Sequence, residues 1–235
     1  MPIFAELEAC KDPAPRSAAM NMAIDEALLE TATIPSIRFY RWNSPALSFG
    51  YFGKFADVAD YAAERDLVRR WTGGGIVFHG DDLTYSIIIP AASEFSSASS
   101  KSIYAMIHAA LCDALNIHGQ RAELAPAAEA AVTDSENSSR AGRGYSRHLC
   151  FANPVSADLM IDSRKIAGAA QRRTRAGLLH QGSIQHVDLG NGLAERFARE
   201  LSNLRSEKLL SGSIVERASE IAERKYGSDH WLKLR

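Results

Sequence analysis

Residues 69–90 read RRWTGGGIVFHGDDLTYSIIIP, a stretch that combines two arginines, three successive glycines and two apolar runs. The runs at 76–79 and 83–90 are rich in β-branched and aromatic residues, and they predict two strands joined by a Gly-Asp-Asp turn. Three successive glycines add nothing to a core, so they are expected where the backbone approaches a neighbour closely or adopts positive φ. A plain turn is the alternative.

The glycines do not form a nucleotide-binding loop of the common kinds. No Gly-Lys-Ser/Thr follows them, and the chain continues into a strand, which excludes a Walker loop and a dinucleotide fingerprint. Arg70 stands beside the backbone N–H groups of Gly73, Gly74 and Gly75. Together with Arg69 it predicts a site suited to a carboxylate or phosphate. Solvated surface charges are the alternative for the two arginines.

Segments before this stretch predict a helix and further strands. Ser17 precedes an apolar pattern of helical spacing, so residues 17–32 are expected to form an amphipathic helix with Ser17 as its N-cap. The aromatic runs 37–42 and 46–52 flank an Asn-Ser-Pro turn and predict a β-hairpin. Residues 57–66 have a helical composition.

Segments after it complete the predicted fold. Residues 100–118 carry apolar side chains at helical spacing, and residues 121–147, rich in Ala, Glu, Ser and Gly, are expected to be a flexible loop. Three strands (ADLMI, RKIAGAA and LLHQGSIQHV) and two helices (192–204 and 213–224) are expected to follow. Because strands outnumber helices, the predicted class is α+β, with a mixed, mainly antiparallel sheet flanked by helices.

Composition sets the broad class. The chain has 235 residues, 46% hydrophobic and 23% charged, enough for one compact domain over residues 1–235. Its 27 Lys and Arg nearly balance 28 Asp and Glu, so no global charge attracts nucleic acid or a membrane. Without a signal-like start or a long apolar run, we expect a cytoplasmic protein. Three widely spaced cysteines with no CxxC pair predict neither disulfides nor a metal site.

Cys150 and Lys165 are the single residues best suited to chemistry. Lys165 begins the run KIAGAA, where its ammonium could reach a buried carbonyl or phosphate oxygen, or could be solvated at a strand end. A thiolate at Cys150 would accept an acyl group from a thioester, and His148 or His180 could help to deprotonate it. A cysteine packed before Phe151 is the alternative.

Seven blocks occur along the chain in the order RFYRW, ALSFGYF, RRWTGGGIVFH, LTYSIIIP, RKIAGAAQRR, LHQGSI and KYGSDHW. Together they resemble the blocks of lipoate-protein ligases and octanoyltransferases in the biotin/lipoate ligase superfamily, from about residue 17 to residue 231. The resemblance implies a class II synthetase-like catalytic domain with a bent tunnel that holds an acyl chain.

The resemblance also implies roles for individual residues. The glycine segment would line the carboxyl end of the tunnel, Lys165 would hold the acyl carbonyl or an adenylate, and His79 would support the glycines. Asp158 stands where ligases carry Asn-Asp, which implies a part in holding a metal or the nucleotide. Gly168 and His180 belong to matching blocks and are expected to contribute to substrate binding.

Two chemistries share this scaffold. The run Cys150-Phe151-x-x-Pro154 resembles cysteine-dependent octanoyltransferases, which need no cofactor and move octanoate from acyl carrier protein to the lysine of a lipoyl domain or glycine cleavage H-type carrier protein. Gly75 instead resembles ATP-dependent lipoate ligases, which would need ATP and Mg and, since the chain ends after KYGSDHW, a separate subunit. We predict the octanoyltransferase, with the ligase as the alternative. A non-catalytic binder and a biotin ligase, which would carry Gly-Arg-Gly, are less favoured.

Overall fold

The structure is a computed structural model that describes residues 2–126, 151 and 154–234. Its strands are β1 (Leu7–Lys11), β2 (Ser36–Tyr40), β3 (Ala46–Phe49), β4 (Asp66–Arg69), β5 (Val77–His79), β6 (Leu83–Pro90), β7 (Glu123–Leu124), β8 (Leu159–Ile161), β9 (Arg164–Arg173), β10 (Gly177–Ile184) and β11 (Arg205–Leu209). Its helices are α1 (Ala18–Thr31), α2 (Ser100–Asn116), α3 (Leu193–Leu201), α4 (Gly212–Ile221) and α5 (Asp229–Leu232). Short turns of helix are η1 (Phe55–Asp57), η2 (Ala59–Tyr61), η3 (Glu94–Ser97) and η5 (Ala222–Tyr226).

The described strands form two sheets. The large sheet has the order β11-β1-β2-β6-β10-β9-β8-β7, and a small sheet has the order β4-β3-β5. In the large sheet β1 pairs in parallel with β2 and β11, whereas every other pairing is antiparallel. The sheet is therefore mixed and mainly antiparallel, which confirms the predicted fold class.

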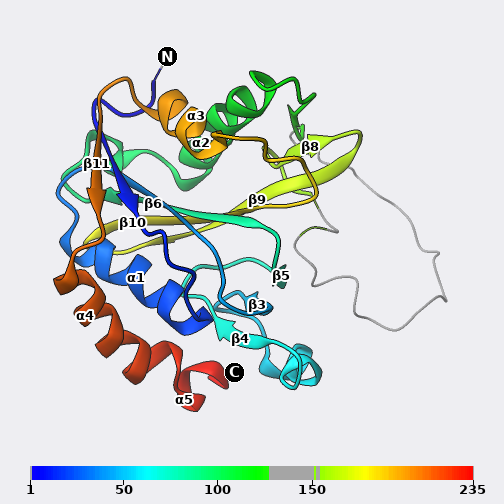
Figure 1. Cartoon of the computed structure of the whole chain (residues 1–235), viewed down its shortest axis with the longest axis vertical. Helices are drawn as coiled ribbons and strands as arrows, with labels where there is room; N and C mark the ends of the chain where they lie inside the picture. Colours follow the sequence, from blue (N-terminus) through cyan, green and yellow to red (C-terminus); the bar gives the residue numbers. More distant parts are fainter. Residues whose placement is uncertain (1, 127–150, 152–153, 235) are drawn as a thin grey trace.

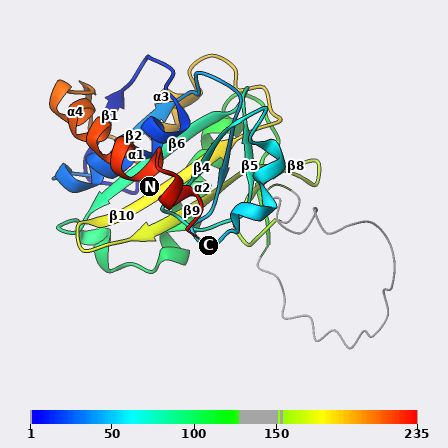
Figure 2. The ribbon, with the colours of Figure 1, turned by 90° about the horizontal axis from the view of Figure 1, so that it is seen from below.

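Helices cover both faces of the large sheet. Figure 1 shows α2 and α3 above the sheet and α1, α4 and α5 below it, with the small sheet also on the lower side. Two apolar cores result, one between the sheet and α2 and α3, and one between the sheet and α1 and α4. Figure 2 shows α1 and α4 lying over the same face. No helix in the described ranges is both long and apolar enough to span a membrane.

Local signals correctly identified the main helices. The α1 helix begins after Ser17, whose Oγ accepts a hydrogen bond from the Met20 amide at 3.3 Å, as predicted for an N-cap. The Ala18 amide donates to Asp66 of β4 at 2.7 Å, which links the start of α1 to the small sheet. Cys112 is buried in α2 within the core.

The predicted hairpin over residues 37–52 and the predicted helix over residues 57–66 are wrong. The β2 strand pairs with β1 and β6 in the large sheet, but β3 pairs with β4 and β5 in the small sheet. The two strands predicted within residues 76–90 form as β5 and β6 with a turn at 80–82, as expected, and they belong to different sheets. The turns reverse the chain as expected, yet each carries it from one sheet to the other, because long-range packing selects the strand partner. Residues 57–66 form only short helical turns before β4 begins.

Two other predicted segments are described in part. Of residues 121–147, those up to 126 are described, and Glu123–Leu124 pair with β8; the rest lies outside the described residues. The basic run at 172–175, predicted to be a turn, lies partly in β9, which continues to Arg173.

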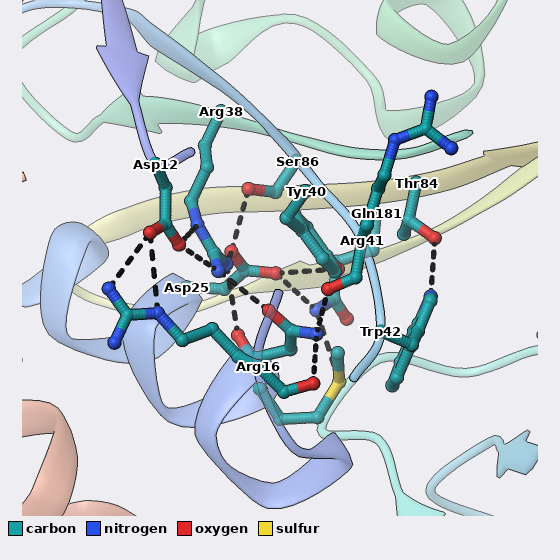
Figure 3. A network of polar contacts seen from close by, with 12 residues as sticks. Asp12, Arg16, Asp25, Arg38, Tyr40, Arg41, Trp42, Thr84, Ser86 and Gln181 are labelled. Atoms are coloured by element: carbon teal, nitrogen blue, oxygen red, sulfur yellow. Dashed lines mark hydrogen bonds and ion pairs between the residues drawn. The ribbon is translucent and has the colours of Figure 1, made fainter. Parts of the chain in front are cut away.

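A buried network of charges joins α1 to the sheet (Figure 3). The Arg38 guanidinium of β2 lies between two carboxylates and is 2.8 Å from both Asp12 and Asp25. Asp25 also accepts a hydrogen bond from Gln181 of β10 at 2.7 Å. Gln181 accepts in turn from Thr72 at 2.9 Å, so the network reaches the segment that contains the glycines. Its paired and hydrogen-bonded charges fix the position of α1 against the strands that carry the candidate site.

Candidate active site

A pocket lined by three of the predicted site residues, Arg70, His79 and Gly168, lies between the large and the small sheet. Its free volume is about 390 Å³, including space open to solvent, and its lining is mainly apolar. Four lining residues are cross-strand neighbours in one row, Tyr40, Thr84, Ser183 and Gly168 on β2, β6, β10 and β9. Three strand spacings make this row roughly 14 Å long. The floor of the pocket thus crosses the strands and suits an extended, narrow, apolar ligand.

The small sheet and α1 supply the remaining walls. Ser48 of β3, Val77 and His79 of β5 and Arg70 after β4 face the pocket from the small sheet, and Met22 faces it from α1. The Trp42 ring stacks on His79 with ring centroids 4.0 Å apart, which closes one side. Two predicted residues, Arg70 and His79, therefore line the same pocket as Gly168.

The triglycine segment (residues 73–75) follows β4 and needs a glycine at position 74. Gly74 has φ +86°, a conformation that favours glycine, and a Cβ there would lie 3.4 Å from the Ala170 side chain of β9. A Cβ on Gly50 would lie 2.1 Å from the Gly74 carbonyl oxygen, so this turn packs directly on the segment. The positive φ explains the glycine at position 74, and the contact with Ala170, which lines the pocket, brings the segment to the pocket wall.

The two arginines bond the protein's own backbone. Arg69 is fully buried and donates to carbonyl oxygens of Tyr51 and Gly53 and of the C-terminal residues Trp231 and Leu232, at 2.6 to 3.2 Å. It fastens α5 to the small sheet, a structural role that differs from the predicted anion site. Arg70 donates to the Gly73 and Gly75 carbonyls at 3.1 and 2.8 Å and shapes the triglycine segment.

Lys165 reaches the same region from β9. Its amine is buried, 2.7 Å from Asp158, which is itself fully buried. A Cβ on Gly168 would lie 2.5 Å from Lys165 Cε and 2.7 Å from Nζ. The lysine side chain therefore lies across Gly168, a pocket-lining residue, and glycine is needed there because a side chain would occupy its place. The structure thus places Lys165 against Gly168 and the triglycine segment beside Ala170, two residues of β9 that line the pocket.

Asp158 is committed to holding Lys165. Besides the lysine, its carboxylate accepts hydrogen bonds from the Tyr104 hydroxyl of α2 and from the Val155 amide, the latter at 2.6 Å. With these donors in place, the carboxylate does not suit a metal ion. No group of three or more His, Cys, Asp or Glu in the described ranges could hold one. Asp158 thus holds Lys165 in this geometry, and the nucleotide role that the resemblance implied stays a prediction.

Tyr104→Phe tests how strongly this carboxylate depends on its donors. Burial, reinforced by the Asp158 charge, raises the pKa of Tyr104, so the hydroxyl is neutral and donates. Losing a hydrogen bond to a charged, buried acceptor is expected to lower the free energy of unfolding by about 2 kcal/mol, measured by urea denaturation. Tyr61→Phe is the control, because that partly exposed hydroxyl makes no hydrogen bond within the described part of the chain. Equal effects of the two changes would contradict the assignment.

His79 is held by a buried hydrogen-bond chain. Its Nδ1 lies 2.7 Å from Asp82, its Nε2 lies 2.6 Å from the Ser48 hydroxyl, and Ser48 accepts from Arg70 Nη1 at 2.7 Å. Burial lowers the pKa of His79 below its usual value, so the ring is neutral at pH 7. Asp82 also accepts from Thr84 of the pocket floor, at 2.8 Å.

His180 and Cys150 stand apart from this arrangement. His180 does not line the pocket; it is fully buried beside α2, hydrogen-bonded to Gln171 at 3.0 Å and to Tyr85 at 3.4 Å. Burial lowers its pKa well below the usual value. Cys150 and His148 lie outside the described residues. Phe151, the residue after the cysteine, is described, and its ring centre is 5.5 Å from the Lys165 amine.

The structure adds site residues that the sequence did not reveal. Ser48 sits within an apolar strand, Asp82 within an apparent turn and Tyr104 on a core helix, and none of these contexts suggests a site. Only Asp82 had a usable signal, because it follows His79 by three residues and a carboxylate often orients an imidazole.

Comparison with known proteins identifies a family and a shared fold. The family described as lipoyl protein ligase A/B catalytic domain matches residues 17–208. The octanoyltransferase LipM of Oceanobacillus iheyensis is 38% identical over 178 residues, which cover 72% of this chain and 60% of that protein. LipM of Staphylococcus epidermidis is 32% identical over 207 residues, covering 84% of this chain and 72% of its own length. The chain thus spans about 60% of the length of several of these relatives.

Solved structures give the same result at the level of the fold. The Ta0514 protein of T. acidophilum with bound lipoic acid superposes with a TM-score of 0.72 at 21% identity, covering 98% of this chain and 99% of that one. Lipoate-protein ligase A bound with ATP superposes with a TM-score of 0.68 at 21% identity, covering 98% and 99%. These likenesses show the fold alone.

Proposed function

The chain belongs to the lipoyl protein ligase A/B catalytic domain family, and from that membership we propose that it transfers an octanoyl group from acyl carrier protein to the lysine of a lipoyl-domain or H-type carrier protein. The observation that carries the proposal is the buried Lys165 amine, held by Asp158 across Gly168 at the end of an apolar pocket. The octanoyltransferases among its relatives support the acyl chain and the reaction class.

The pocket suits the acyl tail. An eight-carbon chain laid along the row from Gly168 to Tyr40 would bury its methylenes against an apolar lining, each contributing about 0.8 kcal/mol. The carbonyl would then lie at the Gly168 end, near the Lys165 amine and the triglycine segment. A cation and backbone N–H groups at that point would stabilise the oxyanion that forms when the thioester is attacked.

In the first step the Cys150 thiolate attacks the octanoyl thioester carbonyl. A new carbon–sulfur bond forms to Cys150, the bond to the carrier sulfur breaks, and the carrier leaves as a thiolate that takes up the proton given up by the Cys150 thiol. Cys150 is favoured over Cys10, because burial raises the pKa of Cys10 to about 11 and keeps that thiol neutral. The position of Phe151 beside Lys165 is consistent with this assignment.

In the second step the neutral amine of the target lysine attacks the enzyme thioester. An amide forms, the bond to Cys150 breaks, and the thiol is regenerated. Because an amide is more stable than a thioester, transfer proceeds in one direction. Neither step consumes ATP or needs a metal, and the donor set at Asp158 fits that route.

The test is an ATP-free acyl transfer measured by intact mass. Wild-type protein incubated with octanoyl acyl carrier protein is expected to gain the mass of one octanoyl group and to pass it to a lipoyl domain. Cys150→Ser is expected to form no stable adduct, whereas Cys10→Ser, which changes an unreactive buried thiol, retains it.

Two outcomes would contradict the proposal. An adduct that persists in Cys150→Ser would exclude the cysteine as acyl carrier. Pyrophosphate release from ATP and lipoate, without any adduct in the ATP-free reaction, would assign the chain to the ATP-dependent lipoate ligases, which Gly75 favours.

A further inference from the structure

The buried hydrogen-bond chain (Asp82, His79, Ser48 and Arg70) runs from the pocket floor to the triglycine segment. Three contacts of 2.6 to 2.7 Å connect its members, and all four side chains are buried. Ser48 belongs to β3, His79 to β5, and Arg70 follows β4. The hydrogen-bond chain therefore crosses all three strands of the small sheet beside the pocket.

The direction of each hydrogen bond follows from Arg70, whose guanidinium can donate hydrogen bonds but cannot accept them. Arg70 only donates, so the Ser48 oxygen must accept from it and direct its own proton to His79 Nε2. A protonated Nε2 would leave that hydroxyl proton without an acceptor. His79 therefore carries its proton on Nδ1 and donates it to Asp82, which sets the tautomer. The Asp82 carboxylate thus determines the position of each proton between it and the Arg70 guanidinium.

The Arg70 guanidinium, at one end of the hydrogen-bond chain, orients two peptide groups. Arg70 Nη2 donates to the carbonyls of Gly73 and Gly75. In a trans peptide the N–H points opposite to the carbonyl, so the N–H groups of Gly74 and Ile76 are directed away from Arg70. No cis peptide occurs in the described part of the chain. Fixing Arg70 thus fixes the backbone donors of the triglycine segment, which otherwise has the freedom of three glycines.

We propose that Ser48 and Asp82 are positioning residues, which act through His79 and Arg70 to hold the triglycine N–H groups in the orientation that the acyl carbonyl requires. The inference rests on the proposed function for its catalytic consequence. The Asp82, His79 and Ser48 contacts resemble a nucleophilic triad, but Ser48 is fully buried and accepts from a guanidinium, which weakens an oxygen nucleophile. Its role is to transmit orientation.

Two substitutions interrupt the hydrogen-bond chain at separate points. Ser48→Ala removes the link between His79 and Arg70, and Asp82→Asn offers an amide donor that favours the opposite imidazole tautomer. Each is expected to lower kcat for octanoyl transfer about tenfold with little change in KM. The double variant is expected to resemble the worse single one, because both act through one chain. Ser48→Cys, which keeps a weaker donor, is expected to fall between wild type and Ser48→Ala.

Ser202→Ala is the matched control, since it removes an equally buried hydroxyl, bonded to the Leu204 carbonyl, far from the pocket. Hydrogen exchange by mass spectrometry provides a readout independent of activity. Peptides spanning residues 71–78 are expected to exchange at least tenfold faster in Ser48→Ala and Asp82→Asn than in Ser202→Ala, with other regions unchanged.

The outcomes separate this inference from the proposed function. Unaltered exchange at 71–78, or multiplicative losses in the double variant, would overturn the positioning role. An octanoyl adduct on Ser48 would overturn it too. If the wild-type protein makes no octanoyl adduct, but residues 71–78 exchange faster in Ser48→Ala and Asp82→Asn as expected, the proposed function is rejected and the positioning role remains supported.

Discussion

Lys165→Ala is expected to lower kcat/KM for octanoyl transfer by roughly 10³-fold, the loss typical of removing a preorganised group that stabilises an oxyanion. The amine is buried beside the pocket and fixed by Asp158 at 2.7 Å, so no reorganisation is needed as negative charge develops on the carbonyl oxygen. Water filling the vacated site would not supply a positive charge. Steady-state transfer from octanoyl carrier protein to a lipoyl domain measures the effect.

Stability has to be separated from chemistry in this experiment, because Lys165→Ala leaves Asp158 buried without its cation. Lys165→Arg keeps a positive charge next to the carboxylate, so the fold is expected to persist, but a planar guanidinium cannot take the place of an ammonium. Its activity should stay at least 10²-fold below wild type. Lys208→Ala, which removes an exposed lysine paired with Glu8, is the control. Near-normal activity in Lys165→Arg would contradict the role.

The parts of the fold that the sequence predicts are those with local causes. The α1 and α2 helices combine a serine N-cap with apolar residues at helical spacing, and both form where expected. The β11 strand was missed because all its residues are exposed, so no apolar alternation marks it. The hairpin prediction for residues 37–52 failed for a different reason. The turn between β2 and β3 reverses the chain, but the choice of sheet depends on packing across the molecule.

Predictability of the site follows the same division. The triglycine segment is an unusual run and was found from the sequence, whereas Gly168 was predicted from the family resemblance; the structure explains Gly74 by its positive φ and Gly168 by the close approach of Lys165. Ser48 and Tyr104 look like ordinary strand and helix residues, and their hydrogen bonds to partners 31 and 54 positions away cannot be read from spacing. Arg69 was predicted to bind an anion, and its bonds to backbone carbonyls could not be foreseen because those partners lie up to 163 positions away.

Gly168→Ala is expected to lower kcat about 100-fold while the fold is retained, because the new methyl group takes the space of the Lys165 side chain. The added Cβ would lie 2.5 Å from Cε and 2.7 Å from Nζ. Carbon atoms pack at about 3.5 Å or more, so the lysine must move by at least about 1 Å. A displacement of that size is enough to cost about 10²-fold in rate. Transfer kinetics measure the expected loss of kcat, and thermal melting of the same samples measures whether the fold is retained.

The fold is expected to survive because the clash involves the far end of a flexible side chain, and Gly168 does not have positive φ. Gly212→Ala is the matched control, since a Cβ there would meet nothing within 4 Å. Its kcat should stay within about threefold of wild type, as expected for a surface change. Wild-type kcat in Gly168→Ala would show that the lysine amine does not need its place across Gly168. A large loss confined to kcat would instead tie the rate to the position of this one amine, since the lysine charge and Asp158 are both retained.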